Sequence, residues 1–176
     1  MLSIVMLIVD AIATLLGGAL LLRFWMQAIR VRPPSSVAQF TFQLSDWLVR
    51  PMRRIVPGVG GYDWASLIGA FLIVLLATSV LFVAGWPAQA VLLMACQRFL
   101  QWILYGFMAL LVVEAIFSWI NPHAPLAPFV RALNEPLLRP LRRVVPLVGN
   151  LDLSLLVALI LLQIANILLG MAFSGR

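Results

Sequence analysis

The sequence predicts an all-α membrane protein with four transmembrane helices, arranged as two tandem two-helix repeats that each carry a cytoplasmic amphipathic interfacial helix. Of its 176 residues, 64% are hydrophobic and only 10% are charged, whereas a soluble domain carries about 25% charged residues. Four apolar runs reach the roughly 20 residues that a helix needs to cross a bilayer. These runs lack the alternation at every second residue that strands show. A duplicated basic motif, described below, indicates the tandem arrangement.

Residues 1–87 form the first predicted repeat, with transmembrane helices at about 2–22 and 64–83. The first apolar run has no basic segment before it, so we interpret it as a retained span and not a cleavable signal peptide. Between the spans, residues 36–50 place apolar side chains on one helical face and polar ones on another, which is typical of a helix lying in the membrane interface. The apolar face comprises Val37, Phe40, Leu44 and Leu48.

Residues 88–176 form the second predicted repeat. Its transmembrane helices are expected at about 100–120 and 151–173, and its interfacial helix at about 126–139. Phe129, Leu133 and Leu137 repeat the apolar stripe of the first interfacial helix. Each repeat holds two spans, so both copies enter the membrane in the same orientation and are related by an axis along the membrane normal.

The motif that marks the repeat reads RPMRRIVPGVGGYD from Arg50 and RPLRRVVPLVGNLD from Arg139. Nine of the 14 aligned residues are identical. Prolines at both ends of each basic stretch predict a short, stiff turn after the interfacial helix, and Asp63 and Asp152 stand where an N-cap belongs. The arginines offered to lipid or to a partner are Arg50, Arg53, Arg54, Arg139, Arg142 and Arg143. Two interpretations stay open: a membrane anchor, or a docking site for anions or partners.

Every basic residue is an arginine, and the formal net charge is +6. The arginines gather in the loops at about 23–63 and 121–152, so the positive-inside rule places both loops in the cytoplasm and both termini outside it. Guanidinium groups bind phosphate in a planar fork, which suits anionic lipid head groups, although genomic base composition explains an all-arginine count equally well. Nucleic acid is not an expected partner, because the arginines lie beside apolar spans and not on a soluble basic face.

Polar residues within the predicted spans form a second group of candidates. They are Asp10, Arg23, Gln101, Glu114, Gln163 and Asn166. Charged groups inside a bilayer are costly and face one another, water or a partner. With a two-residue gap near Val31, Arg23 and Glu114 occupy equivalent positions of the two halves. They either pair across the pseudo-twofold axis or reach separately to the interface.

No enzyme signature and no cofactor are expected. The single cysteine, Cys96, excludes an internal disulfide, and the single histidine, His123, excludes a multi-histidine metal site within one chain. Phosphate loops and nucleophile elbows are also missing from the sequence.

The two RPxRRxVPxxGxxD motifs, with LLLRFWMQ from Leu20 and AIFSW from Ala115, resemble the YggT family and its YlmG relatives. The resemblance covers nearly the whole chain, and LLLRFWMQ is most similar to the proteobacterial branch. It implies a multi-pass protein of the bacterial inner membrane, linked in proteobacteria to osmotic stress and potassium uptake. In photosynthetic relatives it implies links to nucleoid distribution, division and cytochrome maturation. It supplies no catalytic residues.

Two functions follow from these observations. The favoured one is a non-enzymatic scaffold or stress-related assembly factor whose arginine-rich turns dock anionic lipid or a membrane-protein partner. The alternative is a small transporter or channel component in osmotic or potassium homeostasis. Four spans leave little room for an aqueous path in a monomer, so transport would require a homo-oligomer.

Overall fold

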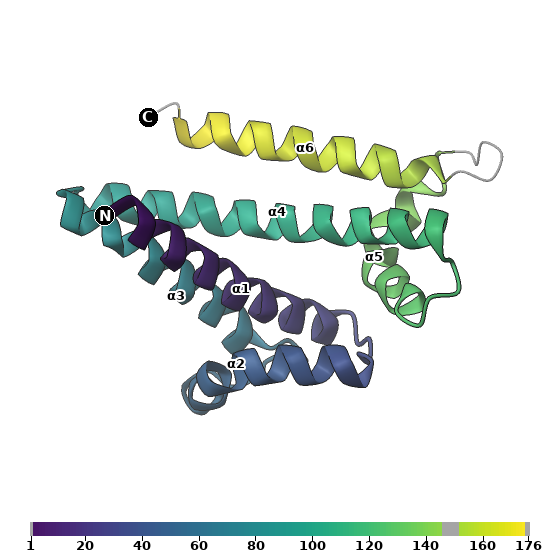
Figure 1. The fold of residues 1–176 in the computed structure, drawn as a ribbon, viewed down its shortest axis with the longest axis horizontal. Helices are drawn as coiled ribbons and strands as arrows, with labels where there is room; N and C mark the ends of the chain where they lie inside the picture. Colours follow the sequence, from purple (N-terminus) through teal and green to yellow (C-terminus); the bar gives the residue numbers. More distant parts are fainter. Residues whose placement is uncertain (1, 146–151, 175–176) are drawn as a thin grey trace. The chain divides into compact units, whose positions relative to one another are not determined.

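The computed structural model describes residues 2–145 and 152–174, and these form a succession of helices. In chain order the elements are α1 (Leu2–Ala28), α2 (Ser35–Ile55), α3 (Trp64–Ser79), the 3-10 helix η1 (Val80–Ala84), α4 (Ala88–Ile120), α5 (Ala127–Leu141) and α6 (Leu153–Ser174) (Figure 1). The expected start of the last span at Leu151 and the motif residues Pro146, Val148 and Gly149 lie outside the described residues.

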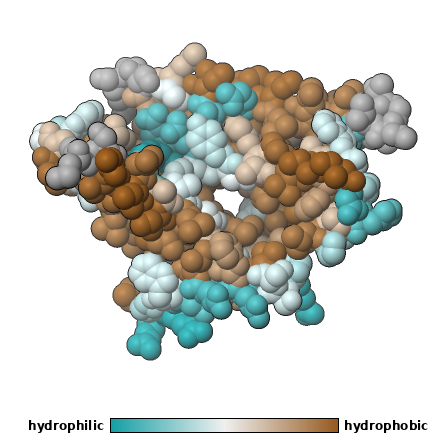
Figure 2. Space-filling model, in the orientation of Figure 1, coloured by the Kyte–Doolittle hydropathy of each residue, from teal (hydrophilic) through white to brown (hydrophobic). Residues whose placement is uncertain are grey.

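Four stretches are long and apolar enough to cross a membrane: Ile4–Ala28, Trp64–Ala84, Ala88–Ile120 and Leu153–Phe173. Their side chains are largely uncovered by the protein itself: Leu7, Leu76 and Leu168 are 70%, 65% and 59% exposed. Hydrophobic residues accordingly cover much of the visible surface (Figure 2). An apolar exterior over helices of this length is what lipid contact requires.

The chain divides into two compact units. The first contains the residues up to Arg30 together with Ser35–Ile103, so it holds α1, α2, α3 and the first half of α4. Small residues let its helices approach closely: Ala13 of α1 and Ala65 and Ala70 of α3 are buried in one apolar cluster, with Leu20 and Val49. A Cβ added at Gly17 would lie 2.1 Å from the indole of Trp102, so this side chain of α4 packs directly against the α1 backbone.

The second unit contains Val31–Pro34 and the residues from Leu104 onward, and so holds the second half of α4 with α5 and α6. Its core joins Leu111 of α4, Leu138 of α5, and Leu155 and Ala158 of α6. Leu111 and Leu138 are fully buried. In the first unit, therefore, α2 packs onto α1 and α3 through Val49. In the second unit, α5 packs onto α4 and α6 through Leu138.

Several boundaries differ from the expectation. α1 continues to Ala28, six residues past the predicted end at about 22. α4 begins at Ala88, twelve residues before the predicted start at 100, because Gln97 and Arg98 interrupt the apolar pattern without ending the helix. α2 continues through Pro51 to Ile55, so Arg53 and Arg54 belong to its last turn and the stiff turn expected between Pro51 and Pro57 is wrong over that part. α5 likewise carries Pro136 and Pro140 inside its helical span. Each proline removes one intrahelical donor, and the ion pairs described next hold both helix ends.

Candidate functional site

Asp63 organises the first basic turn. It is the N-cap residue of α3, only 2% exposed, and accepts hydrogen bonds from the backbone N–H of Ser66 at 3.4 Å and from the Ser66 hydroxyl at 2.7 Å. Arg53, ten residues earlier, donates from Nη2 to Oδ2 at 2.6 Å and from Nε to Oδ1 at 3.3 Å. This two-pronged contact is the geometry in which arginine binds a carboxylate most strongly.

Two glycines turn the chain so that Asp63 returns to Arg53. Gly60 and Gly61 have φ angles of 69° and 83°, in the left-handed region that residues with a Cβ rarely adopt. The turn is closed by the Val59 carbonyl, which accepts from the Tyr62 backbone N–H at 3.3 Å and from the indole N–H of Trp64 at 3.1 Å.

Arg23 of α1 enters the same cluster from the membrane-spanning segment. It is 7% exposed, and its Nη1 donates to the Ser45 hydroxyl and to Asp46 Oδ1, each at 2.7 Å. Its Nε lies 3.4 Å from Asp63 Oδ2, and its guanidinium stands 4.8 Å from the centre of the Phe42 ring. A buried cation is thus neutralised by two carboxylates from α2 and the α3 cap.

Arg142 has the corresponding place in the second unit. Its Nε donates to Asp152 Oδ2 at 2.8 Å, again ten residues along the chain. Its two other nitrogens bind Glu135 of α5 at 3.0 Å and Glu114 of α4 at 3.2 Å. One arginine therefore joins three carboxylates from three parts of the chain.

Glu114 is 4% exposed and has a second partner, Asn134. The Asn134 amide is fully buried and donates to Glu114 Oε2 at 2.8 Å and to the Leu110 carbonyl at 2.9 Å. Asn134 and Ser45 hold equivalent positions in the two halves of the sequence, and each binds the charged residue of the preceding span.

Each cluster contains a motif arginine that binds the aspartate of its turn, Arg53 in the first and Arg142 in the second. The charged residue that the preceding span contributes has the opposite sign in the two clusters. Arg23 of the first span finds carboxylates, and Glu114 finds Arg142. Each of these two charged residues therefore has an oppositely charged partner inside its own unit, so neither requires the pairing between them that the sequence suggested.

Three carboxylates outside the spans have lowered pKa values. Burial raises the pKa of Asp63, but the hydrogen bonds from Arg53 and Ser66 and the neighbouring guanidinium charges outweigh burial and leave it below its usual value. The balance at Asp152 is the same, with Arg142 as the donor. The hydrogen bond from Arg23 lowers the pKa of Asp46 in spite of burial. All three carboxyl groups are stabilised as anions by arginine.

The six motif arginines therefore have three different environments. Arg53 and Arg142 bind the carboxylates of the turn. Arg50 is 79% exposed and pairs with Asp46 at 2.8 Å. Within the described part of the chain, the remaining three form no ion pair and are exposed: Arg54, Arg139 and Arg143.

The polar residues deeper in the apolar helices differ in their partners and in their exposure. Asp10 pairs with Arg98 at 3.0 Å, with the two side chains 42% and 34% exposed. Asn166 donates to the Tyr105 hydroxyl at 3.3 Å. Gln101 is half-buried and Gln163 is exposed.

Sequence reasoning missed the structural partners of the candidate residues. Asp46 binds Arg23, and Glu135 binds Arg142. The two acids are separated by 89 residues, the same offset as the two copies of the motif. That shared offset was the available signal. Arg98 had no comparable signal, since it precedes the predicted start of the span at about 100.

The CCB3/YggT family profile matches residues 2–84 and 93–173. The chain belongs to the CCB3/YggT family. It is 31% identical to the uncharacterized protein YggT of Escherichia coli over 148 residues, which cover 84% of this chain and 79% of that one. An uncharacterized protein of Vibrio alginolyticus is 34% identical over 163 residues, covering 85% and 84% of the two chains. No solved structure matches the chain.

Proposed function

We propose that this CCB3/YggT protein is a non-enzymatic scaffold of the bacterial inner membrane, built from two tandem units whose outward arginines hold anionic lipid at the cytoplasmic surface. The two segments matched by the family profile support the tandem arrangement. Each unit also has a contact between an arginine and the aspartate ten residues later in the chain, which supports the same arrangement.

The observation that carries the proposal is that neighbouring arginines of the motif make different contacts. Arg53 is bound to Asp63, whereas its neighbour Arg54 is exposed. Beside Arg54, the side chain of Ile55 is 83% exposed, and in the second unit Val144 is 81% exposed beside Arg143. Cations next to uncovered apolar side chains, at or just after the C-terminal ends of α2 and α5, suit the boundary between acyl chains and phosphates.

The faces of α2 fit the same location. Thr41, Ser45 and Val49 are buried against the unit, while Phe40 and Trp47, seven residues apart, are 54% and 58% exposed. An amphipathic helix of this kind lies in the interface with aromatic side chains at the head-group level. Each arginine close to an anionic surface contributes about 1 kcal/mol.

The test measures lipid selectivity directly. The protein is reconstituted in phosphatidylcholine with a trace of spin-labelled phosphatidylglycerol, and electron paramagnetic resonance gives the fraction of labelled lipid held at the protein surface. The wild type is expected to hold phosphatidylglycerol over phosphatidylcholine, and 0.5 M salt is expected to reduce this preference. The double variant Arg54→Gln/Arg143→Gln is expected to lose a large part of it.

The matched control is Arg53→Gln/Arg142→Gln, which removes the same charge from neighbouring positions. It is expected to lower stability and to leave the lipid preference near that of the wild type while the protein remains folded. Equal loss of lipid preference in the two double variants would contradict the proposal.

A second function is favoured by one observation, the Asp10–Arg98 ion pair among apolar helices. The Asp10 side chain is 42% exposed. If the pair lies at membrane depth, it therefore needs contact with water or with another protein surface. A homo-oligomer that encloses this pair would serve as a transporter component in osmotic or potassium balance. Potassium flux into liposomes, abolished by Asp10→Asn, would support this alternative, and flux equal to that of empty liposomes would reject it.

A further inference from the structure

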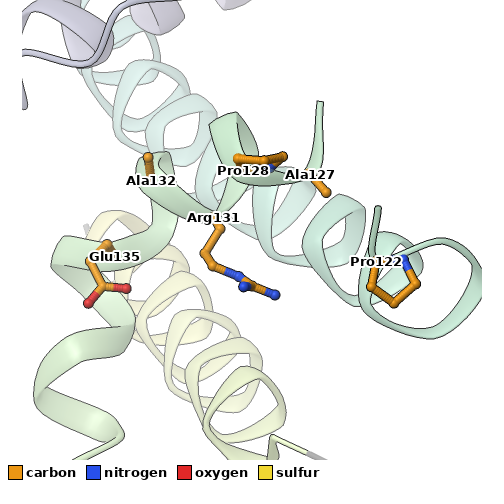
Figure 3. Close-up of a pocket in the computed structure, with 6 residues that line it drawn as sticks. All are labelled: Pro122, Ala127, Pro128, Arg131, Ala132 and Glu135. Atoms are coloured by element: carbon orange, nitrogen blue, oxygen red, sulfur yellow. The ribbon is translucent and has the colours of Figure 1, made fainter. Parts of the chain in front are cut away.

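A cavity of about 300 Å³ lies within the second unit, where the chain leaves α4 and enters α5. Its lining residues are Pro122, Ala127, Pro128, Arg131, Ala132 and Glu135. Figure 3 draws the Arg131 side chain projecting from α5, with Pro122 and Glu135 on either side of it. The volume is at the lower end of the range for ligand pockets, so it suits a head group and not a large molecule.

The cavity carries one charge of each sign. Arg131 and Glu135 are one helical turn apart on α5, but Glu135 uses its Oε2 for Arg142, at 3.0 Å. Arg131 is exposed and has no ion-pair partner among the residues that the structure describes. The Glu135 side chain is still 47% exposed, so its carboxylate remains accessible from the cavity side. A ligand with separate positive and negative groups is therefore complementary to this cavity.

The position along the chain points to a lipid as the source of that ligand. Pro122 follows Ile120, the last residue of the span-length helix α4, by two residues. Trp119 and Ile120 are 73% and 80% exposed. An exposed tryptophan at the end of an apolar helix is typical of the head-group region of a bilayer, which places the cavity at the depth of phospholipid head groups.

We propose that this cavity binds the head group of a phospholipid that carries a primary amine, as phosphatidylethanolamine does. The phosphate binds the Arg131 guanidinium, which matches phosphate oxygens with paired donors. The ammonium group donates to the Glu135 carboxylate. A choline head group has no N–H to donate, and a glycerol head group offers the carboxylate no cation. The site uses neither Arg54 nor Arg143, so it is independent of the lipid contact proposed for the turns.

Native mass spectrometry tests the site with the full chain. The protein is released from nanodiscs that contain equal amounts of phosphatidylethanolamine, phosphatidylcholine and phosphatidylglycerol, and the retained lipids are counted. The wild type is expected to retain phosphatidylethanolamine in preference to phosphatidylcholine. The Arg54→Gln/Arg143→Gln variant, which lacks the phosphatidylglycerol contacts proposed for the turns, is expected to retain phosphatidylethanolamine in preference to both other lipids. Arg131→Gln is expected to reduce its retention roughly tenfold, as the loss of a charged hydrogen bond does. Arg32→Gln, at an exposed arginine outside both the cavity and the motif, is expected to have no effect.

Glu135→Gln tests the amine contact separately. It is expected to bring phosphatidylethanolamine and phosphatidylcholine retention to the same level, while Arg142 keeps its contacts with Glu114 and Asp152. Unchanged helicity and melting temperature show that the variants are folded. Full retention in Arg131→Gln, a wild-type preference for phosphatidylcholine, a preference for phosphatidylglycerol in Arg54→Gln/Arg143→Gln, or an unchanged preference in Glu135→Gln would overturn the proposal.

Discussion

Replacing Asp63 with Asn removes one negative charge from a place where two guanidinium groups meet. Asp63 is 2% exposed and Arg23 is 7% exposed, so the loss leaves a buried cation with Asp46 as its remaining carboxylate. Breaking a buried ion pair costs about 3–5 kcal/mol. Arg53 is 46% exposed and can turn toward water, so we expect the lower end, about 3 kcal/mol. Asn keeps the N-cap, whereas Asp63→Ala loses it and costs about 1 kcal/mol more.

The equivalent change in the second unit, Asp152→Asn, is expected to cost less. Asp152 is 20% exposed and Arg142 is 29% exposed, so water screens their contact. Arg142 also keeps Glu114 at 3.2 Å and Glu135 at 3.0 Å. We therefore expect a loss of about 1 kcal/mol, close to that of a partly exposed ion pair.

The assay is equilibrium unfolding in mixed micelles with an increasing fraction of sodium dodecyl sulfate, followed by helicity. The expected order of destabilisation is Asp63→Ala, then Asp63→Asn, then Asp152→Asn. Gln39→Ala, at an exposed position of α2, is the control and should stay within about 0.5 kcal/mol of the wild type. The reasoning fails if Asp63→Asn is as stable as this control, or if Asp152→Asn costs more than Asp63→Asn.

Two further predictions concern pH and packing. The folded-state pKa of Asp63 is lowered, so its contribution to stability is complete above the unfolded pKa of about 3.9 and is lost as pH falls through the folded value. Unfolding free energy should therefore drop below about pH 4, less steeply in Asp63→Asn; an identical acid slope in the two proteins would contradict this. Gly17→Ala brings a Cβ to 2.1 Å from Trp102 and should cost about 1–3 kcal/mol in the same unfolding assay. Gly18→Ala, with nothing within 4 Å, is the matched control, and equal stability of the two variants would refute the close approach.

The helical architecture and the four span-length helices were predictable because apolar run length depends directly on bilayer thickness. The boundaries were less predictable. Arg98 lies before the predicted span start at about 100, yet it is within α4 and is paired with Asp10 at 3.0 Å. Pro51 looked like the end of a helix, yet α2 continues to Ile55. In both cases a contact distant in sequence, or at the next helix cap, offsets an unfavourable local residue.

The candidate site was predictable in composition but not in its internal arrangement. Spacing alone cannot tell which arginine of Arg53 and Arg54 turns inward, since the answer depends on the reversal at Gly60 and Gly61. The two alternatives considered for Arg23 and Glu114, pairing with one another or reaching separately to the interface, took only span residues into account. Their partners come from the helices that follow each span, where Asp46 and Arg142 lie.

The central claim is that neighbouring motif arginines have different roles, one binding the turn and the other binding lipid. Arginine-selective chemical labelling with a dicarbonyl reagent tests this claim most directly. Labelling rates are measured by peptide mass spectrometry for the protein in neutral and in anionic bilayers. We predict that Arg54 and Arg143 react faster than Arg53 and Arg142 in neutral lipid, and that anionic lipid protects only the faster pair. Equal rates for the two pairs, or labelling of Arg54 and Arg143 that does not depend on lipid charge, would contradict the account.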